Sequence, residues 1–518
     1  MVPNTTLWTA ALLSLSLLVP LAVGASGETD AAAAEDPDRT VAIELMQGAW
    51  VGTPRGEDDP YQKWLNENYN VEFTLNNTRE FPSQVLVRFA SDDVPDIISH
   101  YNKDLMVNLW REGVLVEDWN AYAGDVPTVL REMAELAKTA LTFDGKLALL
   151  ASPPNPAIWA WKVRTDWLAN LGLEVPTTPE ELLEVARKFT FDDPDGNGKD
   201  DTYAFTSAGN KSGVGEIRNL VQMWAAEQTF GIEDNAVTHP IVSGEWKEFL
   251  DFLRTVVSEK LIDPDWYTIS WNDRKPALFA GRYGLAWYPG VLANESENGT
   301  GNTGKTIGWW QTMATPVGGE RGGTIPEGSL WGITRTVSAE AESDAVKMAR
   351  ILRIIEDTAY PNDGFWKLRW GVEIDGFVVK DAGDGWKFMN VQGEVGVNKR
   401  GYCDGCNLGL YDWGYSIASR GDKLIEGSGD ELEGATLAEL EMNKAALRLP
   451  TYPRYDLLLT LDPTLVEDLN VMQAEFDFRY ATGETSDYDG FRDRWMAAGG
   501  QQLLDEAEAQ FRNFGLIK

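Results

Sequence analysis

The sequence predicts an α/β protein in which helices cover mostly parallel sheets. Between Val41 and Ser99, apolar strand-like runs alternate with segments of helical periodicity in the order β-α-β-α-β. Beyond Ala157 helical patterns resume, which indicates a second α/β region. Strands that alternate with helices in this way form a parallel sheet covered by helices. The 518 residues are enough for about three domains or two large lobes with full cores.

The first region contains three predicted strands and two predicted helices. In chain order these are Val41–Met46, Tyr61–Tyr69, Val71–Leu75, Phe81–Ala90 and Asp96–Ser99. The preceding segment, residues 26–40, is small, acidic and aperiodic, which is typical of a flexible leader. We therefore expect the fold to begin near Val41.

The second region opens with two predicted helices, Arg164–Leu171 and Thr178–Phe189. Thr178 is a candidate N-cap, Pro179 suits the first helical position, and Glu181 completes a capping box. The helical spacing predicts a buried stripe formed by Leu182, Val185, Ala186 and Phe189.

The later part of the chain combines a loop with further helices. Residues 290–328 are rich in Gly, Thr and Asn, which predicts a surface loop, and Ile307–Trp310 within them predicts a crossing strand. Phe491–Phe511 predicts two helical blocks around Gly499 and Gly500. A core helix is predicted over Asp344–Asp357, with a buried face formed by Val346, Ala349, Leu352 and Ile355.

The charge balance excludes an electrostatic nucleic-acid or membrane-surface role. The chain carries 81 acidic and 45 basic side chains, for a net charge of -36, and has no basic cluster. Such a surface repels phosphate groups and anionic lipids. We therefore expect no nucleic-acid partner.

The first 25 residues predict a secretory signal peptide. They contain no charged side chain and include the apolar run Ala10–Gly24, with small residues at Val23 and Ala25 where a signal peptidase cuts. The run is short for a bilayer span, which needs roughly 20 residues. Ser26 stands where a lipoprotein signal would place Cys. The sequence thus predicts a soluble periplasmic or extracellular protein.

The segment Asp192–Tyr203 is the most specific local signal for a metal site. It places oxygen ligands at alternate positions of a tight loop, with Gly198 at the sharp turn, as in an EF-hand. Ala204 replaces the bidentate Glu of the twelfth position, so a complete EF-hand is excluded. The alternative is an Asx-rich turn without an ion. The candidate calcium ligands are the side chains of Asp193, Asp195, Asn197 and Asp201 and the carbonyl of Lys199.

The abundance of tryptophan favours a carbohydrate ligand. The chain has 21 Trp, more than its 19 Phe. An indole face packs against the C–H face of a pyranose while neighbouring polar groups bind its hydroxyls. For any single Trp, core packing is the alternative. Those in polar or Gly-flanked surroundings are Trp50, Trp159, Trp161, Trp271, Trp287, Trp309, Trp310, Trp331 and Trp413.

Other motifs carry little chemistry. Gly299–Thr306 matches a phosphate-binding loop in spacing, but no buried strand precedes it and no helix follows. Cys403 and Cys406 favour a short disulfide over free thiols in an oxidising compartment. Only two His are present and there is no Gly-x-Ser-x-Gly turn, so a nucleophilic triad has few possible bases. Glycosidase carboxylates cannot be singled out among 81 acids.

An ordered set of segments resembles the extracellular solute-binding proteins of bacterial ABC importers. The resemblance is to the large oligosaccharide-binding group that includes LplA-like and alginate-oligosaccharide-binding proteins. It covers most of the chain from Val41 onward. The segments are Gln84–Ile98 (QVLVRFASDDVPDII), Phe143–Leu147 (FDGKL), Arg164–Phe189, Asp193–Tyr203 (DPDGNGKDDTY), Gly371–Val378 (GVEIDGFV) and Tyr480–Phe511.

This resemblance implies a type II periplasmic-binding-protein fold, with two α/β lobes, a hinge that closes on ligand, and a calcium ion in the Asp193–Asp201 loop. Chain crossings are expected near Ala151–Arg164, near Gln311–Gly319 and after Ile355. The expected organisation is a signal peptide at 1–25 and a leader at 26–40, followed by lobe 1 at 41–157 and 317–366 and lobe 2 at 158–316 and 367–518.

The function implied is capture of an oligosaccharide by a monomeric protein and its delivery to an ABC permease, without catalysis. A secreted glycoside hydrolase or lyase is the alternative, and turnover of a glycan would reveal it. A calcium-stabilised glycan-binding module is a further alternative, which predicts no enclosed pocket. Arg164 is the expected charged contact, or it instead pairs with Asp166 or Asp201. The predicted substrate-binding residues are Trp50, Asp96, Trp159, Trp161, Arg164, Trp287, Trp331 and Trp413.

Overall fold

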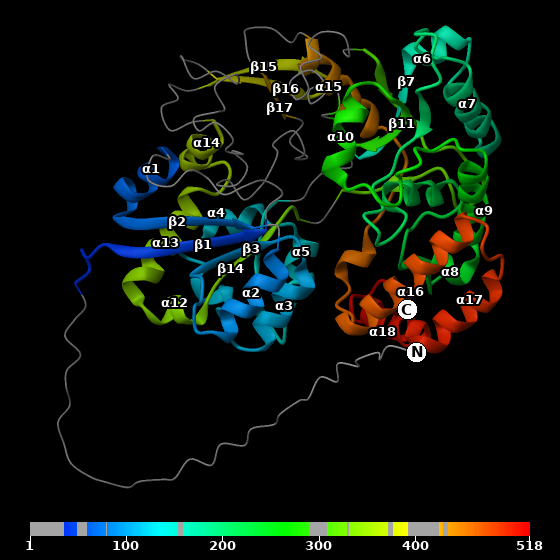
Figure 1. Ribbon diagram of the computed structural model, residues 1–518. Coiled ribbons are helices and arrows are strands. Elements are labelled where there is room, and N and C mark those ends of the chain that lie inside the picture. The colour runs from blue at the N-terminus through cyan, green and yellow to red at the C-terminus, as the bar shows by residue number, and fades with distance from the viewer. Residues whose placement is uncertain are drawn as a thin grey trace, which may run out of the picture. The chain divides into compact units, whose positions relative to one another are not determined.

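The computed structural model describes residues 36–48, 60–78, 80–153, 159–290, 292, 308–328, 331–370, 377–391, 424–427 and 434–518. Contacts divide the chain into Met1–Arg39 and Thr40–Lys518, and every element below lies in the second unit (Figure 1). Several predictions fall outside the described residues: the signal peptide, Trp50, Gly299–Thr306, Cys403, Cys406 and Trp413.

The first sheet has five strands in the order β2-β1-β3-β14-β6. The three N-terminal strands are parallel, with Val41 opposite Val71 and Leu45 opposite Ile97, whereas β14 runs antiparallel to β3 and to β6. This confirms the predicted β-α-β-α-β order. The strands and connecting helices are β1 (Val41–Gly48), α1 (Pro60–Tyr69), β2 (Val71–Thr78), α2 (Phe81–Ala90), β3 (Ile97–His100), β6 (Leu150–Ala151) and β14 (Thr334–Val337).

Helices pack on this sheet through regularly spaced apolar side chains. On α1, Tyr61, Leu65 and Tyr69 recur every four residues and all are buried, because such positions share one helix face. The smaller elements of this region are α3 (Lys103–Arg111), α4 (Pro127–Glu132), α5 (Glu135–Ala140), β4 (Thr142–Phe143), β5 (Lys146–Leu147), α12 (Ala339–Ser343), α13 (Ala345–Asp357) and α14 (Asp363–Trp370).

Helix α13 forms where predicted, but its buried face is rotated from the expected one. Asp344 caps it, because its carboxylate accepts a hydrogen bond from the Lys347 amide at 2.9 Å. Ala349 is exposed, which corrects the predicted stripe. The buried residues are Met348, Ile351, Leu352, Ile354 and Ile355.

The second sheet has four strands in the order β12-β7-β11-β8. Strand β11 runs antiparallel to β7 and parallel to β8, and β12 runs antiparallel to β7. The elements of this region are β7 (Ala160–Arg164), α6 (Thr165–Leu171), α7 (Pro179–Phe191), β8 (Tyr203–Phe205), η3 (Gly215–Met223), β9 (Gly231–Glu233), β10 (Ala236–Thr238), α8 (Pro240–Ser243), α9 (Glu245–Ser258), α10 (Trp271–Phe279), β11 (Tyr283–Tyr288) and β12 (Trp310–Thr312).

Helix α7 confirms the prediction made from its caps and periodicity. The Thr178 hydroxyl accepts a hydrogen bond from the Glu181 amide at 3.2 Å, and the predicted stripe of four apolar residues is buried. The Glu181 carboxylate accepts a hydrogen bond from the Thr177 amide at 2.8 Å. The Glu181 side chain therefore completes the capping box at the amide of Thr177, one residue before the predicted N-cap.

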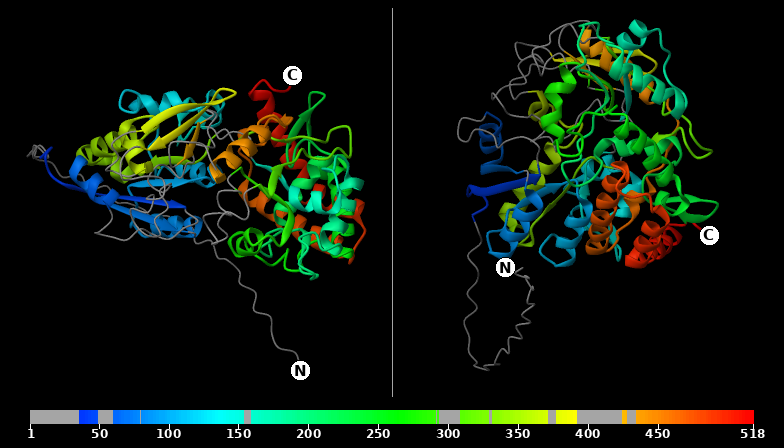
Figure 2. Two further views of the ribbon diagram at one scale, coloured as in Figure 1. Left: turned by 90° about the horizontal axis from the view of Figure 1, so that it is seen from above. Right: turned by 45° about the vertical axis from the view of Figure 1, so that its right-hand side comes forward.

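The C-terminal helices pack against the second region. Figure 1 shows α17 beside α9, and the right-hand view of Figure 2 shows the orange-to-red end of the chain against green segments. The Trp246 indole of α9 donates a hydrogen bond to Asp477 of α16 at 2.9 Å. Gly499 has φ 132°, which allows the predicted break between the last two helices. These helices are α16 (Pro463–Ala481), α17 (Tyr488–Trp495), a π-helical turn at Met496–Gly500 and α18 (Gln501–Asn513).

The remaining elements form a third sheet and a two-stranded pair. The chain passes from the first sheet to the second between β6 and β7, near the first expected crossing. It returns only between β13 and β14, later than the crossing expected at Gln311–Gly319, because the amides of Val317 and Gly323 still donate hydrogen bonds to carbonyls of the second region. No helix in the described part is long and apolar enough to cross a membrane. The remaining elements are β13 (Ile325–Pro326), β15 (Phe377–Gly383), β16 (Trp386–Val391), β17 (Leu424–Gly427), α15 (Gly434–Ala446), β18 (Thr451–Tyr452) and the 3-10 turn η7 (Tyr455–Leu458).

Candidate functional site

The second region contains a cavity of about 1010 Å³. Three segments supply most of its walls: Ala208–Asn219, the aromatic residues around β7, α10 and β11, and one face of α16. Cavities of this size accommodate small-molecule ligands when apolar walls carry a few convergent polar groups. The lining aromatic residues are Trp159, Trp246, Tyr267, Trp271, Trp287 and Phe478.

Aromatic rings support one another along this wall. Trp271 stacks on Tyr288 with ring centres 5.3 Å apart and an angle of 8° between the planes. Trp159 lies 5.9 Å from Trp271, and 42% of its surface is exposed. Ring packing restricts these side chains before any ligand arrives, which lowers the entropy that binding costs. The wall therefore presents preordered apolar faces.

Two glycines allow the opposite wall to lie close to the rest of the fold. The Gly209 amide donates a hydrogen bond to the Trp266 carbonyl at 2.9 Å, and a Cβ at Gly209 would lie 2.6 Å from the Tyr267 carbonyl oxygen. Gly215 has φ +67°, a left-handed conformation that favours glycine. The Glu216 carboxylate accepts a hydrogen bond from the Ala208 amide at 2.7 Å. This backbone is thereby fixed, and η3 follows it.

Two ionisable side chains from separate elements, Asp477 and Arg218, line the cavity. Asp477 of α16 is buried, and burial raises the pKa of its carboxyl to about 7. Arg218 of η3 retains contact with solvent, but the surrounding protein lowers the pKa of its guanidinium through desolvation. An arginine stays charged at physiological pH even so. The cavity therefore contains a cation beside a carboxyl that titrates near neutrality.

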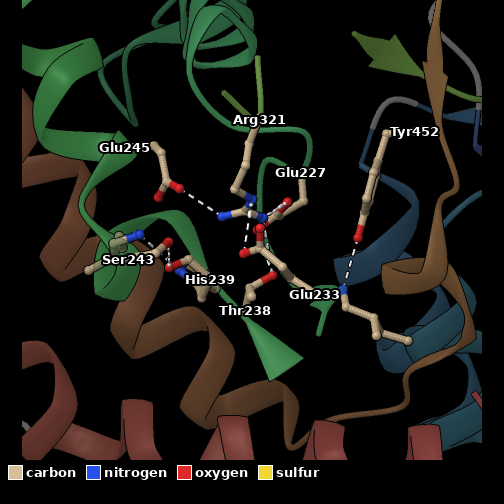
Figure 3. A network of polar contacts seen from close by, with 10 residues as sticks. Glu227, Glu233, Thr238, His239, Ser243, Glu245, Arg321 and Tyr452 are labelled. Carbon is tan, nitrogen blue, oxygen red and sulfur yellow. Dashed lines mark hydrogen bonds and ion pairs between the residues drawn. The ribbon is translucent and has the colours of Figure 1, made fainter. Parts of the chain in front are cut away.

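An ion network beside the cavity neutralises a buried glutamate (Figure 3). Arg321 pairs with Glu227, whose side chain is 2% exposed, and also with Glu245 at 2.7 Å and Glu233 at 3.1 Å. Nearby, the Tyr452 hydroxyl accepts a hydrogen bond from the Ile232 amide at 2.9 Å. The network joins the loop before β13 to the start of α9 and to β9.

Two of the predicted substrate-binding residues, Trp159 and Trp287, line the cavity. Trp161 does not line it, because it is fully buried and packs against Trp287 and Phe205. Its position two residues from Trp159 gave no sign of this difference.

Arg164 serves the core of the second region rather than the cavity. Its guanidinium donates to the Asp166 carboxylate at 2.6 and 2.8 Å, so the Asp166 alternative is the one observed. It also lies 4.1 Å from the centre of the Trp309 ring. The centre of the Trp167 ring is 4.4 Å away, and a third donor bonds the Gly281 carbonyl at 3.1 Å. Because these partners already occupy its guanidinium, Arg164 is removed from the candidate contacts.

Asp96 and Trp331 lie in the first region and have packing roles. The Asp96 carboxylate accepts hydrogen bonds from the Glu44 amide at 2.8 Å and from Lys347 at 2.6 Å. Trp331 is 5% exposed and belongs to the hydrophobic core beneath the first sheet. Trp50 and Trp413 lie outside the described residues.

Several cavity residues were not selected from the sequence. Trp271 was counted among the tryptophans in polar surroundings but not among the predicted binding residues. Its helix, WNDRKPALF, has few apolar residues that could bury it. No local pattern marks Arg218, Asp477 or Phe478, because they come together only through the packing of α16 beside η3 and α9.

The Asp193–Asp201 loop brings two carboxylates to the side-chain amide of Asn197 and a third to the backbone amides of Asn197 and Gly198. The Asn197 amide nitrogen lies 2.8 Å from Asp195 and 3.2 Å from Asp201, and Asp193 accepts a hydrogen bond from the Gly198 amide at 2.9 Å. Burial, with Asp193 and Asp201 nearby, raises the pKa of Asp195. The oxygen donors suit a hard cation. No three His, Cys, Asp or Glu side chains in the described part are arranged to hold a metal.

Comparisons with known proteins identify related sequences and folds. No family model matches the chain. It is 23% identical over 520 residues to the polygalacturonan/rhamnogalacturonan-binding protein YtcQ of Bacillus subtilis, covering 98% of this chain and 99% of that protein. It is 28% identical over 252 residues to the fructooligosaccharide ABC transporter substrate-binding protein FusA of Streptococcus pneumoniae, covering 42% and 45%.

A solved structure of the alginate-binding protein AlgQ2 matches with a TM-score of 0.66 and 17% identity, covering 92% of this chain and 98% of that one. The chain therefore has the α/β fold of solute-binding proteins. FusA is named as an ABC-transporter substrate-binding protein, and YtcQ and AlgQ2 are named for the polysaccharides that they bind; none of these three names is that of an enzyme.

Proposed function

We propose that this chain is the substrate-binding component of an ABC importer that captures an oligosaccharide and delivers it chemically unchanged. The observation that carries the proposal is the cavity of the second region, which is lined both by indole rings packed against each other and by polar side chains. Similarity to YtcQ along nearly the whole chain supports it.

The cavity chemistry fits the two kinds of surface that a sugar ring presents. Trp159 and Trp271 offer apolar faces to the C–H groups of a pyranose. Asn219, Asn470 and Gln473 line the same cavity and carry donors and acceptors for hydroxyl groups. Stacking supplies affinity and the polar groups fix orientation, so the site binds without needing a reactive residue.

We also propose the transport setting that the relatives suggest. The protein is exported through the signal peptide at residues 1–25 and acts as a monomer in the periplasm or outside the cell. Its chain forms two lobes with the boundaries expected from the sequence, except that the segment around Arg321 belongs with the second lobe, to which its ion pairs join it. Ligand favours the closed arrangement because that state makes more contacts with it, and a permease recognises the closed form.

The Asp193–Asp201 loop binds calcium in this proposal. Gly196 and Gly198, at φ 68° and 75°, allow the tight turn that a calcium-binding loop of this kind needs. In this loop Asp193, Asp195, Asn197 and Asp201 would hold the ion, with the Lys199 carbonyl. Solved structures of FusA include one described as an EF-hand mutant. A calcium ion there would neutralise the crowded carboxylates and stabilise the fold.

Isothermal titration calorimetry with purified protein tests the function directly. Galacturonan, fructan and milk-type oligosaccharides are titrated separately, and each ligand is recovered afterwards for mass spectrometry. We expect saturable binding of at least one class with a stoichiometry of one, and recovery of the ligand at its original mass. Shortened saccharides, or no binding by any class, would contradict the proposal.

A further inference from the structure

A smaller cavity adjoins the aromatic one and has a different character. Its volume is about 210 Å³, room for on the order of seven water molecules or one sugar-sized group. Arg218, Trp246, Asn470 and Gln473 line both cavities. A ligand in the larger cavity can therefore extend a single unit or substituent into the smaller one.

The wall of the smaller cavity contains a buried polar side chain without a partner. Gln222 is fully buried, and neither its amide oxygen nor its amide nitrogen has a hydrogen-bond partner. An unsatisfied buried polar group costs about 1–3 kcal/mol, so native proteins seldom keep one without a reason. A polar ligand group in this cavity would satisfy the Gln222 amide.

The charges around the smaller cavity leave one cation unpaired. Glu227 is neutralised by Arg321, and Asp456 accepts two hydrogen bonds of 2.8 Å from Arg454. Among the described residues, Arg218 has no hydrogen bond or ion pair. Glu216 is bonded to the Ala208 amide and also lies near Arg218 without contacting it. The cavity thus offers an available guanidinium beside an available amide.

We propose that the smaller cavity binds the carboxylate of a uronic acid unit, held by the Arg218 guanidinium and the Gln222 amide. This inference rests on the proposed function and names the class of glycan. A guanidinium matches a carboxylate through two parallel hydrogen bonds, which a neutral sugar cannot offer. This pairing would let a protein with a net charge of -36 bind an anionic glycan, because recognition then depends on local contacts rather than on long-range attraction.

The nearby carboxyl of Asp477 does not prevent this. Its carboxylate oxygen already accepts a hydrogen bond from the Trp246 indole at 2.9 Å. Because burial raises its pKa to about 7, much of the Asp477 population is neutral in slightly acidic solution. The unpaired positive charge of Arg218 then determines which ligand charge the cavity accepts.

Calorimetry with two matched probes tests this inference: trigalacturonate and its fully methyl-esterified form, which differ in charge but not in the sugar chain. The wild type should bind the acid at least tenfold more tightly than the ester. Arg218→Gln should weaken acid binding at least tenfold and ester binding less than twofold, with Arg218→Lys between them. Lys63→Gln, which removes one positive charge from an exposed side chain of α1, is the control and should change neither affinity.

A second variant tests the amide. Gln222→Leu removes both unsatisfied polar atoms, so it should leave the melting temperature equal or higher while weakening binding of the acid. Equal affinity of the wild type for acid and ester, or an equal loss of both in Arg218→Gln, would overturn the inference and leave the proposed function intact. Binding of neutral oligosaccharides without any binding of trigalacturonate would also overturn the inference and leave the proposed function intact. Failure of every saccharide would overturn the proposed function and this inference together.

Discussion

At the scale of single residues, Asp477 makes the stability of the protein depend on pH. Burial raises the pKa of its carboxyl to about 7, against an ordinary value of 3.8. The folded state therefore holds a proton that the unfolded chain releases above about pH 4. The stabilisation is fully present below pH 4 and is lost as the pH rises to 7. The pKa difference corresponds to at most about 4 kcal/mol of unfolding free energy.

Asp477→Asn should remove this pH dependence, because the amide oxygen still accepts the Trp246 hydrogen bond and cannot ionise. We expect the variant to gain stability relative to the wild type as the pH increases from 5 to 8, by roughly 1–3 kcal/mol. Urea denaturation at four pH values measures this difference. Asp489→Asn changes an exposed carboxylate and is the control. Parallel stability curves for Asp477→Asn and the wild type would contradict the assignment.

Trp159 and Trp161 are two residues apart and should respond oppositely to substitution. Trp159 is 42% exposed in the cavity, so Trp159→Ala should weaken glycan binding about tenfold with little change in melting temperature. Trp161 is fully buried, so Trp161→Ala should cost about 3–5 kcal/mol of unfolding free energy. Calorimetry and denaturation of both variants measure the contrast. Unchanged affinity in Trp159→Ala would remove that ring from the site.

This contrast shows how far the sequence could predict the site. The excess of tryptophan indicated a sugar ligand, and Trp159 and Trp287 do line the cavity. Which rings are accessible depends on long-range packing, because Trp161 is covered by Trp287 and Phe205 from other strands. The same limit applies to Arg218, since nothing near it in sequence indicates that its charge is unpaired.

At the scale of elements, capping residues and apolar spacing predicted the bounds of helices that depend on neighbouring residues. Helix α2 has the predicted bounds, Phe81–Ala90, and α7 begins at its predicted cap, because caps and apolar spacing are properties of a few neighbouring residues. The buried face of α13 was predicted wrongly at Ala349. Alanine is tolerated on either face of a helix, so packing against the first sheet set the rotation instead.

The Arg321 network should contribute strongly to the stability of the loop before β13. Arg321→Met would leave Glu227, with its side chain 2% exposed, as a buried charge with no cation. Removing one partner of a buried pair costs about 3–5 kcal/mol. The double variant Arg321→Met/Glu227→Gln should recover much of this loss, because no charge then remains buried. Guanidinium denaturation of both variants measures it.

The matched control for this network is Arg187→Met, which breaks an exposed pair with Glu259. Exposed pairs contribute about 0–1 kcal/mol, so this variant should stay close to the wild type. Equal losses in Arg321→Met and Arg187→Met would show that the network is no more than a surface feature.

The Asp193–Asp201 loop should link stability to calcium. Binding to the folded state alone raises stability by about 1.4 kcal/mol for each tenfold increase in ion concentration above the dissociation constant. We expect the melting temperature in millimolar calcium to exceed that in EDTA, and Asp195→Asn to reduce the difference. Differential scanning calorimetry measures it, with magnesium as the comparison ion. Identical melting temperatures in calcium and EDTA would leave the loop as an Asx-rich turn.

At the scale of the whole molecule, the sequence predicted the α/β class and the parallel start of the first sheet. It did not predict that β14 joins this sheet antiparallel to β3 and to β6, because β3 lies more than two hundred residues earlier in the chain. Such pairing depends on the chain returning from the second sheet. The resemblance to solute-binding proteins, rather than periodicity, indicated that return.

A transport protein should gain stability from its ligand without consuming it. If the oligosaccharide binds only the folded chain, the unfolding free energy should rise by about 1.4 kcal/mol per tenfold excess of ligand over its dissociation constant. The melting temperature should keep rising with ligand concentration and remain raised after overnight incubation, because no turnover depletes the ligand. A hydrolase or lyase would instead lose the shift as its products accumulate. Repeated thermal scans of one sample, with Trp159→Ala as the matched weak binder, distinguish the two behaviours.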